Sequence, residues 1–149
     1  RALKDAIDRY GGLFIASAGN SGTNNDAAPI YPASYTSGNI LSVAAIDPYH
    51  TLARFSNYGF ESVDIAAPGT GILSLDLQGG YTPKNGTSMS APHVAGAAAL
   101  LKAYMPALSA STIKNIILSS AVKIPGLAGK VLTGGALDVN AMFELANRL

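Results

Sequence analysis

The chain has 149 residues, of which 48% are hydrophobic and 13% are charged, and its formal net charge is +1. This length is sufficient for one domain with a buried core, and a charged fraction about half of the usual ~25% is typical of a compact α/β protein or of a piece covered by further chain. The small net charge and the lack of a Lys/Arg cluster give no indication of nucleic-acid or membrane-surface binding. No apolar run approaches the ~20 residues of a membrane span, and the absence of Cys excludes disulfides, thiol catalysis and Cys-type zinc sites.

In chain order, the first half predicts one helix and three strands. Residues 1–12 have helical spacing of apolar side chains and end on two glycines. Continuous apolar runs follow at 13–20, 40–47 and 62–69, the first two separated by a loop rich in polar residues and proline. Because such runs are typical of strands buried on both faces, we expect an α/β fold with a mainly parallel sheet covered by helices. Ligands of such sheets bind at the carboxyl ends of the strands.

The second half of the chain predicts a hairpin followed by three helices. Residues 71–82 resemble a hairpin that turns at Gly79 and Gly80. The three helices are expected at about Met89–Tyr104, at 109–121 with Ser109 or Ser111 as N-cap, and at 138–149 with Asp138 as N-cap.

Ser88 lies where a polar turn meets a helix of small residues, and two interpretations are open. It is either an N-cap that only begins the helix, or a nucleophile whose oxyanion the helix N-terminus would stabilise. Gly86 permits a close approach of the backbone, which favours the second interpretation. Ser90 replaces the second glycine of the hydrolase pattern G-x-S-x-G, which argues against an esterase of another fold.

The segment NGTSMSAPHVAG, residues 85–96, resembles the nucleophile motif of the subtilisin-like serine proteases, the subtilases. ASAGNSG (16–22) is similar to the family's oxyanion asparagine segment, and YPASY (31–35), ILSVAAID (40–47) and the stretch from FSNYG to VDIAAPG (55–69) follow in the family's order. The resemblance covers essentially the whole chain. It implies that residues 1–149 are the C-terminal portion of a subtilisin-like peptidase catalytic domain.

The resemblance also implies a reaction and two catalytic residues. The chain would belong to a serine endopeptidase that hydrolyses peptide bonds through an acyl-enzyme on Ser88. The side-chain amide of Asn20 and the backbone N–H of Ser88 would converge on the oxyanion. Without the resemblance, Asn20 would be interpreted as an ordinary turn residue.

No residue of this chain matches the family's catalytic base. His93 follows Ser88 by five residues on the same expected helix, about 140° round its axis, so we expect it to be packed or capped in the core. His50 is expected in an exposed turn, Asp64 as a structural residue at a strand end, and Asp76 as a surface charge of the hairpin.

The resemblance therefore places the catalytic Asp and His in an upstream segment, and the start at Arg1 within a helix suggests a fragment or a cleaved enzyme. We expect the chain alone to be inactive. The alternative function is that of a catalytically silent, subtilase-like binding or structural module.

The resemblance further assigns substrate contacts and partners. An S1 pocket for an apolar P1 residue would be walled by Ala16–Gly19 and Ile30–Ala33, with Ile30 limiting its depth, and Lys84 and Asn85 would lie on the leaving-group side. Partners would be protein or peptide substrates, the upstream segment and a prodomain inhibitor, in a secreted or extracytoplasmic enzyme. We expect no cofactor or metal site in this segment, the carbonyls of 33–38 being interpreted as a plain loop, although calcium is implied for the full-length enzyme. The candidate residues are Ser88, Asn20, Ala16, Ser17, Ala18, Gly19, Ile30, Tyr31, Pro32, Ala33 and Asn85.

Overall fold

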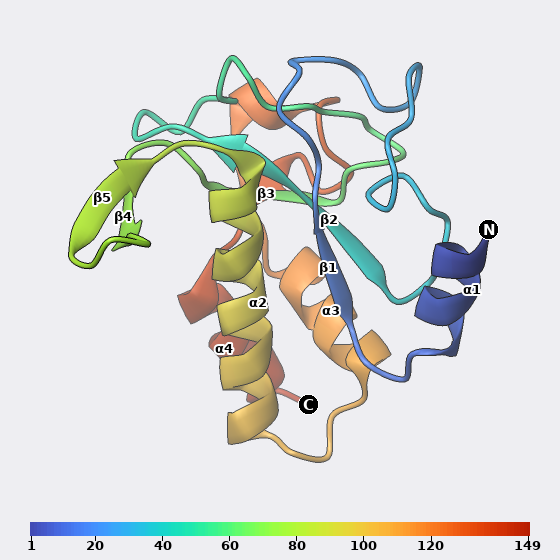
Figure 1. Ribbon diagram of the computed structural model, residues 1–149. Coiled ribbons are helices and arrows are strands. Elements are labelled where there is room, and N and C mark those ends of the chain that lie inside the picture. Colours follow the sequence, from blue (N-terminus) through green and yellow to red (C-terminus); the bar gives the residue numbers. More distant parts are fainter.

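A five-stranded sheet in the order β1-β2-β3-β7-β6 forms the centre of the computed structural model, which describes residues 1–149 (Figure 1). The mainly parallel α/β sheet expected from the sequence is confirmed, because β6 alone runs antiparallel to its neighbour. All seven residues of β2 are buried, as expected for a strand covered on both faces. The bounds are β1 (Phe14–Ser17), β2 (Ile40–Ile46), β3 (Ile65–Pro68), β6 (Val122–Lys123) and β7 (Gly135–Ala136).

Three of the four α-helices lie together on one side of the sheet, and α1 lies apart near the N-terminus (Figure 1). Ser109 caps α3 by accepting a hydrogen bond from Thr112 N at 3.1 Å, and Asp138 caps α4 by accepting one from Ala141 N at 2.9 Å. Both caps confirm the sequence predictions. No helix combines the length and the hydropathy of a membrane span. The bounds are α1 (Ala2–Arg9), α2 (Thr87–Tyr104), α3 (Ala110–Ser119) and α4 (Val139–Ala146), with a short 3-10 helix, η1, at Pro125–Leu127.

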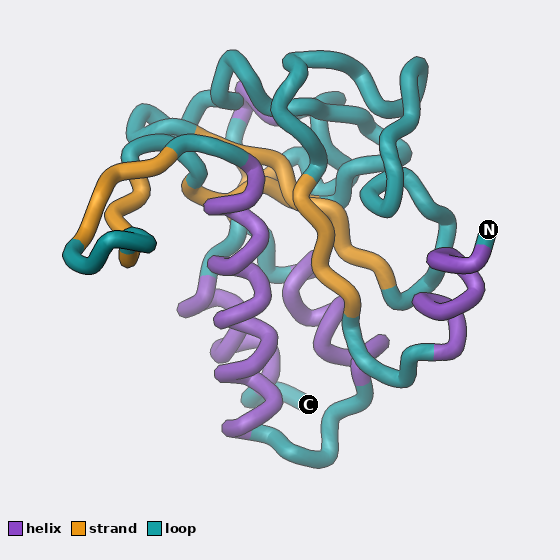
Figure 2. The backbone as a smooth tube through the Cα atoms, in the orientation of Figure 1, coloured by secondary structure: helices purple, strands orange, loops and turns teal.

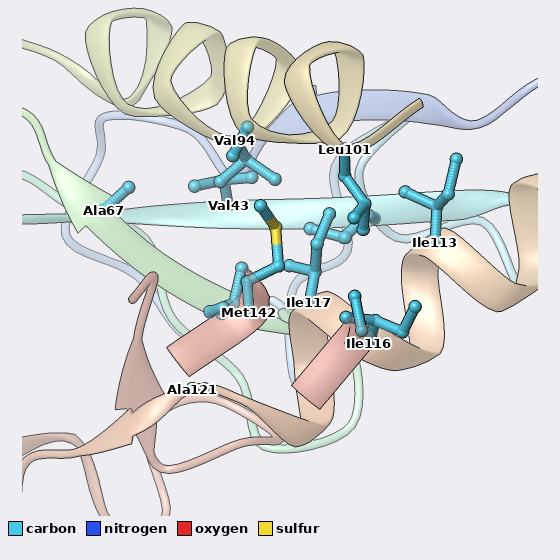
Figure 3. Packing of buried hydrophobic residues seen from close by; sticks show 13 residues of the cluster. Val43, Ala67, Val94, Leu101, Ile113, Ile116, Ile117, Ala121 and Met142 are labelled. Atoms are coloured by element: carbon cyan, nitrogen blue, oxygen red, sulfur yellow. The ribbon is translucent and has the colours of Figure 1, made fainter. Parts of the chain in front are cut away.

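The sheet is covered on both faces by apolar side chains. The larger cluster joins strands β2 and β3 to α2, α3 and α4, and Figure 3 shows Val43, Val94 and Met142 converging there. The smaller cluster includes Ala44 from β2 and Leu127 from η1. Because neighbouring residues of β2 supply opposite clusters, the strand reads as an unbroken apolar run.

The hairpin of β4 (Ile72–Leu75) and β5 (Tyr81–Lys84) projects from the body of the protein, as the tube in Figure 2 shows. In its register Leu73 faces Pro83 and Leu75 faces Tyr81. Side chains that face each other in this way lie on one side of the ribbon, so that side is apolar. The hairpin expected from the sequence is therefore confirmed.

Some details of the fold differ from the sequence predictions. Helix α2 begins at Thr87, two residues earlier than expected, because its N-cap is Gly86. Strands β6 and β7 were not predicted, since two residues are too few to show a periodic pattern.

Candidate active site

Ser88 lies in the first turn of α2 and is exposed. The N-cap of the helix is Gly86, so the interpretation of Ser88 as an N-cap is wrong. Gly86 has φ +151°, a conformation that favours glycine, and its N–H donates to Gly69 O at 2.8 Å. This bond joins the start of α2 to the end of β3, so the serine stands above the carboxyl end of the sheet with the first N–H groups of the helix around it.

Asn20 is brought to this helix terminus from 67 residues away in the sequence. Its Oδ1 accepts hydrogen bonds from Thr87 N at 2.8 Å and from Thr87 Oγ1 at 3.0 Å. Thr87 Oγ1 in turn accepts from Gly19 N at 3.1 Å, and Thr87 is fully buried. Because a backbone N–H can only donate, the atom of Asn20 that faces it must be the oxygen. The amide nitrogen Nδ2 is therefore free to donate elsewhere.

The free amide of Asn20 lies beside the turn that precedes Ser88. A Cβ added at Gly86 would be 3.6 Å from Asn20 Nδ2, an ordinary van der Waals distance, so the amide lies next to this turn. Asn20 itself is exposed. The arrangement can place two donors, Nδ2 of Asn20 and a backbone N–H of the helix terminus, around one external oxygen.

The two segments predicted to wall a substrate pocket lie in contact. A Cβ added at Gly19 would overlap Cδ1 of Ile30, so only glycine lets the walls approach this closely. Ser17 and Gly19 are half-buried, whereas the methyl groups of Ala16 and Ala18 face the core. These walls contain no charged residue.

On the second wall, Ile30 and Tyr31 are exposed, Pro32 is half-buried and Ala33 is buried. The Tyr31–Pro32 peptide bond is cis, and the ring of Tyr31 stacks on Tyr35 with centroids 4.7 Å apart. Ala16, Ala18 and Ala33 therefore offer a substrate no exposed side chain, and the surface available comes from their neighbours.

A shallow cavity of about 260 Å³ lies between Ser88 and the base of the hairpin. Asn85 is exposed but does not line this cavity, and its Oδ1 accepts from Gly71 N at 2.6 Å. The residues that line the cavity are Ile72, Leu73, Ser74, Ser88, Met89, Pro92 and His93.

Neither histidine forms a hydrogen bond with Ser88. The prediction that His93 is a core residue is wrong: it is exposed and borders the same cavity as Ser88, outside the buried stripe of α2 that Ser90, Val94, Ala97 and Leu101 form. Its Nδ1 lies 2.8 Å from Met89 O, the carbonyl one turn earlier on the helix. His50 is exposed in a turn with φ +60°, as expected.

The acidic residues have structural surroundings. Asp64 Oδ2 accepts from Ser42 N at 2.7 Å, and burial raises the pKa of the Asp64 carboxyl although this bond and the Lys114 ammonium act to lower it. Asp76 is paired with Lys84 at 3.3 Å on the surface of the hairpin.

A polar cavity of about 550 Å³ borders the 33–38 loop that was interpreted as a plain loop. The ammonium of Lys114 donates to the carbonyls of Gly38 and Ile40 beside it. No group of three or more His, Cys, Asp or Glu side chains is arranged to hold a metal ion.

Sequence reasoning missed three residues that support this site: Thr87, Asn25 and Asn57. Thr87 and Asn57 stand within the motifs NGTSMSAPHVAG and FSNYG, but nothing in those motifs indicates which side chain each contacts. Asn57 is fully buried and bonds to the loop around Asn20, and it reaches that loop across 36 residues. Contacts of this separation leave no local pattern in a sequence.

Comparisons with known proteins identify relatives of the chain. The model of the subtilase family, peptidase S8, matches residues 2–141. The chain is 42% identical over 127 residues to subtilisin DY of Bacillus licheniformis, a match that covers 83% of this chain and 45% of that protein. It is 37% identical over 148 residues to the extracellular basic protease of Dichelobacter nodosus, covering 92% of this chain and 24% of that protein.

Among solved structures, a protease of Pseudoalteromonas arctica superposes with a TM-score of 0.84 at 31% identity, covering 96% of this chain and 46% of that one. The chain thus spans less than half the length of each of these three proteins.

Proposed function

Because the chain belongs to the subtilase family, we propose that it is the nucleophile-bearing part of a serine endopeptidase. Ser88 Oγ would attack a peptide carbonyl, the amine would leave, and water would hydrolyse the resulting acyl-enzyme. The observation that carries the proposal is the pair of bonds from Thr87 to Asn20 Oδ1, which turn the amide Nδ2 outward beside the turn of Ser88.

The proposed oxyanion hole uses donors that are fixed before the substrate arrives. Asn20 cannot easily rotate its amide, since rotation would place Nδ2 against the backbone N–H of Thr87. Donors held in this way need no reorganisation when the carbonyl oxygen becomes negative, and this is the main source of their catalytic effect.

A serine hydroxyl needs a base within hydrogen-bond reach, and no histidine of this chain supplies it. We propose that a second segment carries the catalytic Asp and His, as in the family. Two surfaces support its binding: β1 is an edge strand, and residues 94–101 of α2 are apolar on every side of the helix, with Ala95, Ala99 and Leu100 exposed. A helix that is apolar on every side is normally buried in a larger protein.

The second segment would extend the sheet and cover the helix. A cavity of about 610 Å³ lies between β1, α2 and the start of α3 and is lined mainly by apolar residues. Apolar side chains of the second segment would bind there. An unpaired strand edge and an apolar helix face leave the chain alone marginally stable, and joining a second segment would satisfy both.

We further propose an apolar P1 preference, because the walls at Ala16–Gly19 and Ile30–Ala33 carry no charge. Protein or peptide substrates, a prodomain inhibitor and calcium binding in the full-length enzyme are carried over from the family. A secreted or extracytoplasmic location is supported by the similarity to the extracellular basic protease of Dichelobacter nodosus.

The alternative function is a catalytically silent module that binds peptides. It is favoured by one observation, that Ser88 Oγ has no histidine among its hydrogen-bond partners. The two functions differ in whether a bound peptide is cleaved.

The test is a peptidase assay on the assembled enzyme, meaning this chain together with the segment that supplies Asp and His. We expect multiple turnovers of a peptide substrate, with new amino and carboxyl termini identified by mass spectrometry. Binding of the peptide without cleavage would establish the silent module in place of the protease.

A further inference from the structure

We propose that Asn57 is a positioning residue that holds the oxyanion loop, residues 18–23, in its working geometry. The inference rests on the proposed function, because it concerns the loop that presents Asn20. Asn57 lies in the connection between β2 and β3 and is 0% exposed, which is rare for an asparagine. A side chain that is so completely buried cannot contact a substrate.

Asn57 bonds to the loop on both sides of Asn20. Its Oδ1 accepts from Ser21 N at 2.8 Å and from Thr23 N at 3.3 Å, and its own N–H donates to Gly19 O at 2.9 Å. The residues immediately before and after Asn20 are therefore tied to a single buried residue. Since both backbone N–H groups are donors, the orientation of the Asn57 amide is determined.

A second buried asparagine completes the network. Asn57 Nδ2 donates to Asn25 Oδ1 at 2.9 Å, and Asn25 Nδ2 donates to Ala18 O at 2.8 Å. Asn25 is 1% exposed. The network thus begins at Ala18, passes through two side-chain amides and returns to the loop at Ser21 and Thr23. Buried polar networks of this kind rigidify a structure when every member is satisfied.

The packing leaves the loop little room to move toward Asn57. A Cβ added at Gly19 would lie 2.7 Å from Asn57 Nδ2, and Gly19 has φ +109°, which favours glycine. The loop is therefore held by Asn57 on its buried side and by Thr87 on the side of α2, where Thr87 Oγ1 accepts a hydrogen bond from Gly19 N. Asn20 is the residue between these two anchors.

Removal of the Asn57 amide would leave the part-buried backbone N–H groups of Ser21 and Thr23 without their acceptor, and the loop would shift to reach water. A shift of about 1 Å at a catalytic group can cost about 10²-fold in rate. We therefore expect Asn57→Ser to lower kcat by about 10- to 100-fold with KM nearly unchanged, because the backbone bond from Asn57 N to Gly19 O, which holds the wall residue of this loop, is retained.

Asn39 supplies a matched control. Its Nδ2 lies within hydrogen-bond distance of three carbonyls, those of Ile7, Tyr10 and Gly12, and so holds α1 to the rest of the fold. Asn39→Ser should lower the melting temperature of the assembled enzyme without changing kcat. A fall in kcat of the same size in both variants would overturn the proposal, because it would show a general effect of lost stability.

A double-mutant cycle tests whether Asn57 acts through Asn20. In the Asn20→Leu background, which lacks the amide donor, Asn57→Ser should have no further effect on kcat. If Asn57→Ser lowers kcat by the same factor in both backgrounds, the inference is wrong while the proposed function stands. If Asn20→Leu alone leaves kcat unchanged, the proposed oxyanion role of Asn20 fails and the inference fails with it.

A milder variant keeps the test open should Asn57→Ser fail to fold. Asn25→Ser removes the bond to Ala18 O and the acceptor of Asn57 Nδ2, but leaves the backbone N–H groups of Ser21 and Thr23 bonded to Asn57 Oδ1. It should lower kcat by a smaller factor, again with KM nearly unchanged and again without effect in the Asn20→Leu background. An unchanged kcat, or a loss equal in both backgrounds, would contradict the proposal.

Discussion

The loop around Asn20 differs from the outer surface formed by α2 and the hairpin. The side chains of the loop region find their partners within the chain, whereas those of the outer surface are left uncovered. Around Asn20, buried polar groups of Thr87, Asn57 and Asn25 are paired within the chain. On the outer surface, large apolar side chains are exposed, among them Leu73 at 65%, Leu75 at 70% and Leu100 at 53%. A single helix, α2, belongs to both regions, since its first turn carries Ser88 and its outer face is uncovered.

This difference indicates which part of the proposed site the chain can build by itself. Hydrogen-bonded geometry is complete where the oxyanion donors lie, so these need no partner to be positioned. The uncovered apolar face lies on the helix that carries Ser88, the proposed nucleophile, to which no histidine of this chain is hydrogen-bonded. Contiguous exposed apolar surface can mark a protein interaction site. The predictions that follow test the two regions separately.

The largest effect is expected from the nucleophile. Ser88→Ala should abolish turnover by the assembled enzyme; in subtilisin, a member of the same family, loss of the nucleophile lowers kcat by about 10⁶-fold. Ser90→Ala is the control, because Ser90 is fully buried on the same turn and its hydroxyl has no hydrogen-bond partner. Peptidase assays of both variants provide the measurement. Comparable loss in Ser90→Ala would show that folding, and not the hydroxyl of Ser88, was tested.

The next effect concerns the oxyanion donor. Asn20→Leu retains bulk and removes the amide, and kcat should fall by about 10²–10³-fold, the range found for the equivalent donor in subtilisin. KM should stay nearly constant because the ground-state carbonyl makes little use of the amide. Steady-state kinetics and a melting curve check this. A raised KM with unchanged kcat would make Asn20 a binding residue.

The outer face of α2 is tested by burying a charge in it. Ala99→Glu should weaken binding of the complementary segment by at least about 100-fold, because an unpaired charge in an apolar interface costs several kcal/mol. Asn115→Glu, on the exposed side of α3, is the matched control. Binding can be measured by titration with the separately produced segment. Equal affinities of both variants would place the interface elsewhere.

The substrate walls give a smaller expected effect. Peptides with an apolar P1 residue should be cleaved with a kcat/KM at least about tenfold above those with a charged one, since an uncharged pocket cannot pair the charge. A peptide library measured with the assembled enzyme provides the values. Preferred cleavage after Arg, Lys, Asp or Glu would show that a part of the enzyme outside these walls sets specificity.

The smallest effect concerns a surface carboxylate near the oxyanion loop. Burial alone would raise the pKa of Asp26, but hydrogen bonds from Ser62 Oγ and from the backbone N–H groups of Glu61 and Ser62 lower it below its usual value. A lowered pKa in the folded state contributes stability above the unfolded pKa of 3.8, and this contribution is lost as the pH falls through the folded value.

Asp26→Asn should therefore reduce the free energy of unfolding by less than about 1 kcal/mol at pH 7, because the group is exposed and screened. The reduction should disappear at acidic pH. Denaturant unfolding of the assembled enzyme at several pH values checks this. A reduction that is equal at pH 7 and at pH 3 would contradict the role assigned to the carboxylate.

The parts of the fold that were predictable are those with local patterns. Buried strands such as β2 appear as continuous apolar runs, and the caps Ser109 and Asp138 precede periodic helices. The two-residue strands β6 and β7 depend on tertiary pairing alone and were invisible. His93 was misplaced because its angle from Ser88 was known but the side of α2 that the sheet covers was not.

The candidate site was also predictable only where a local sequence motif exists. Ser88 and Asn20 were found from motifs, whereas the residues that orient them were not. Thr87 bonds to Asn20 across 67 residues, and Asn57 bonds to Ser21 across 36. A sequence records that these residues are polar, but their partners are defined only once the chain has folded.

The most direct test of the central claim is covalent labelling of Ser88 with a fluorophosphonate serine probe, mapped by mass spectrometry. The claim is that this chain holds a positioned nucleophile and oxyanion donors and lacks a base. We predict negligible labelling of the 149-residue chain alone and rapid labelling of Ser88 once the segment with Asp and His is bound. Rapid labelling of the chain alone would contradict this account, because His50 or His93 would then have to act as the base.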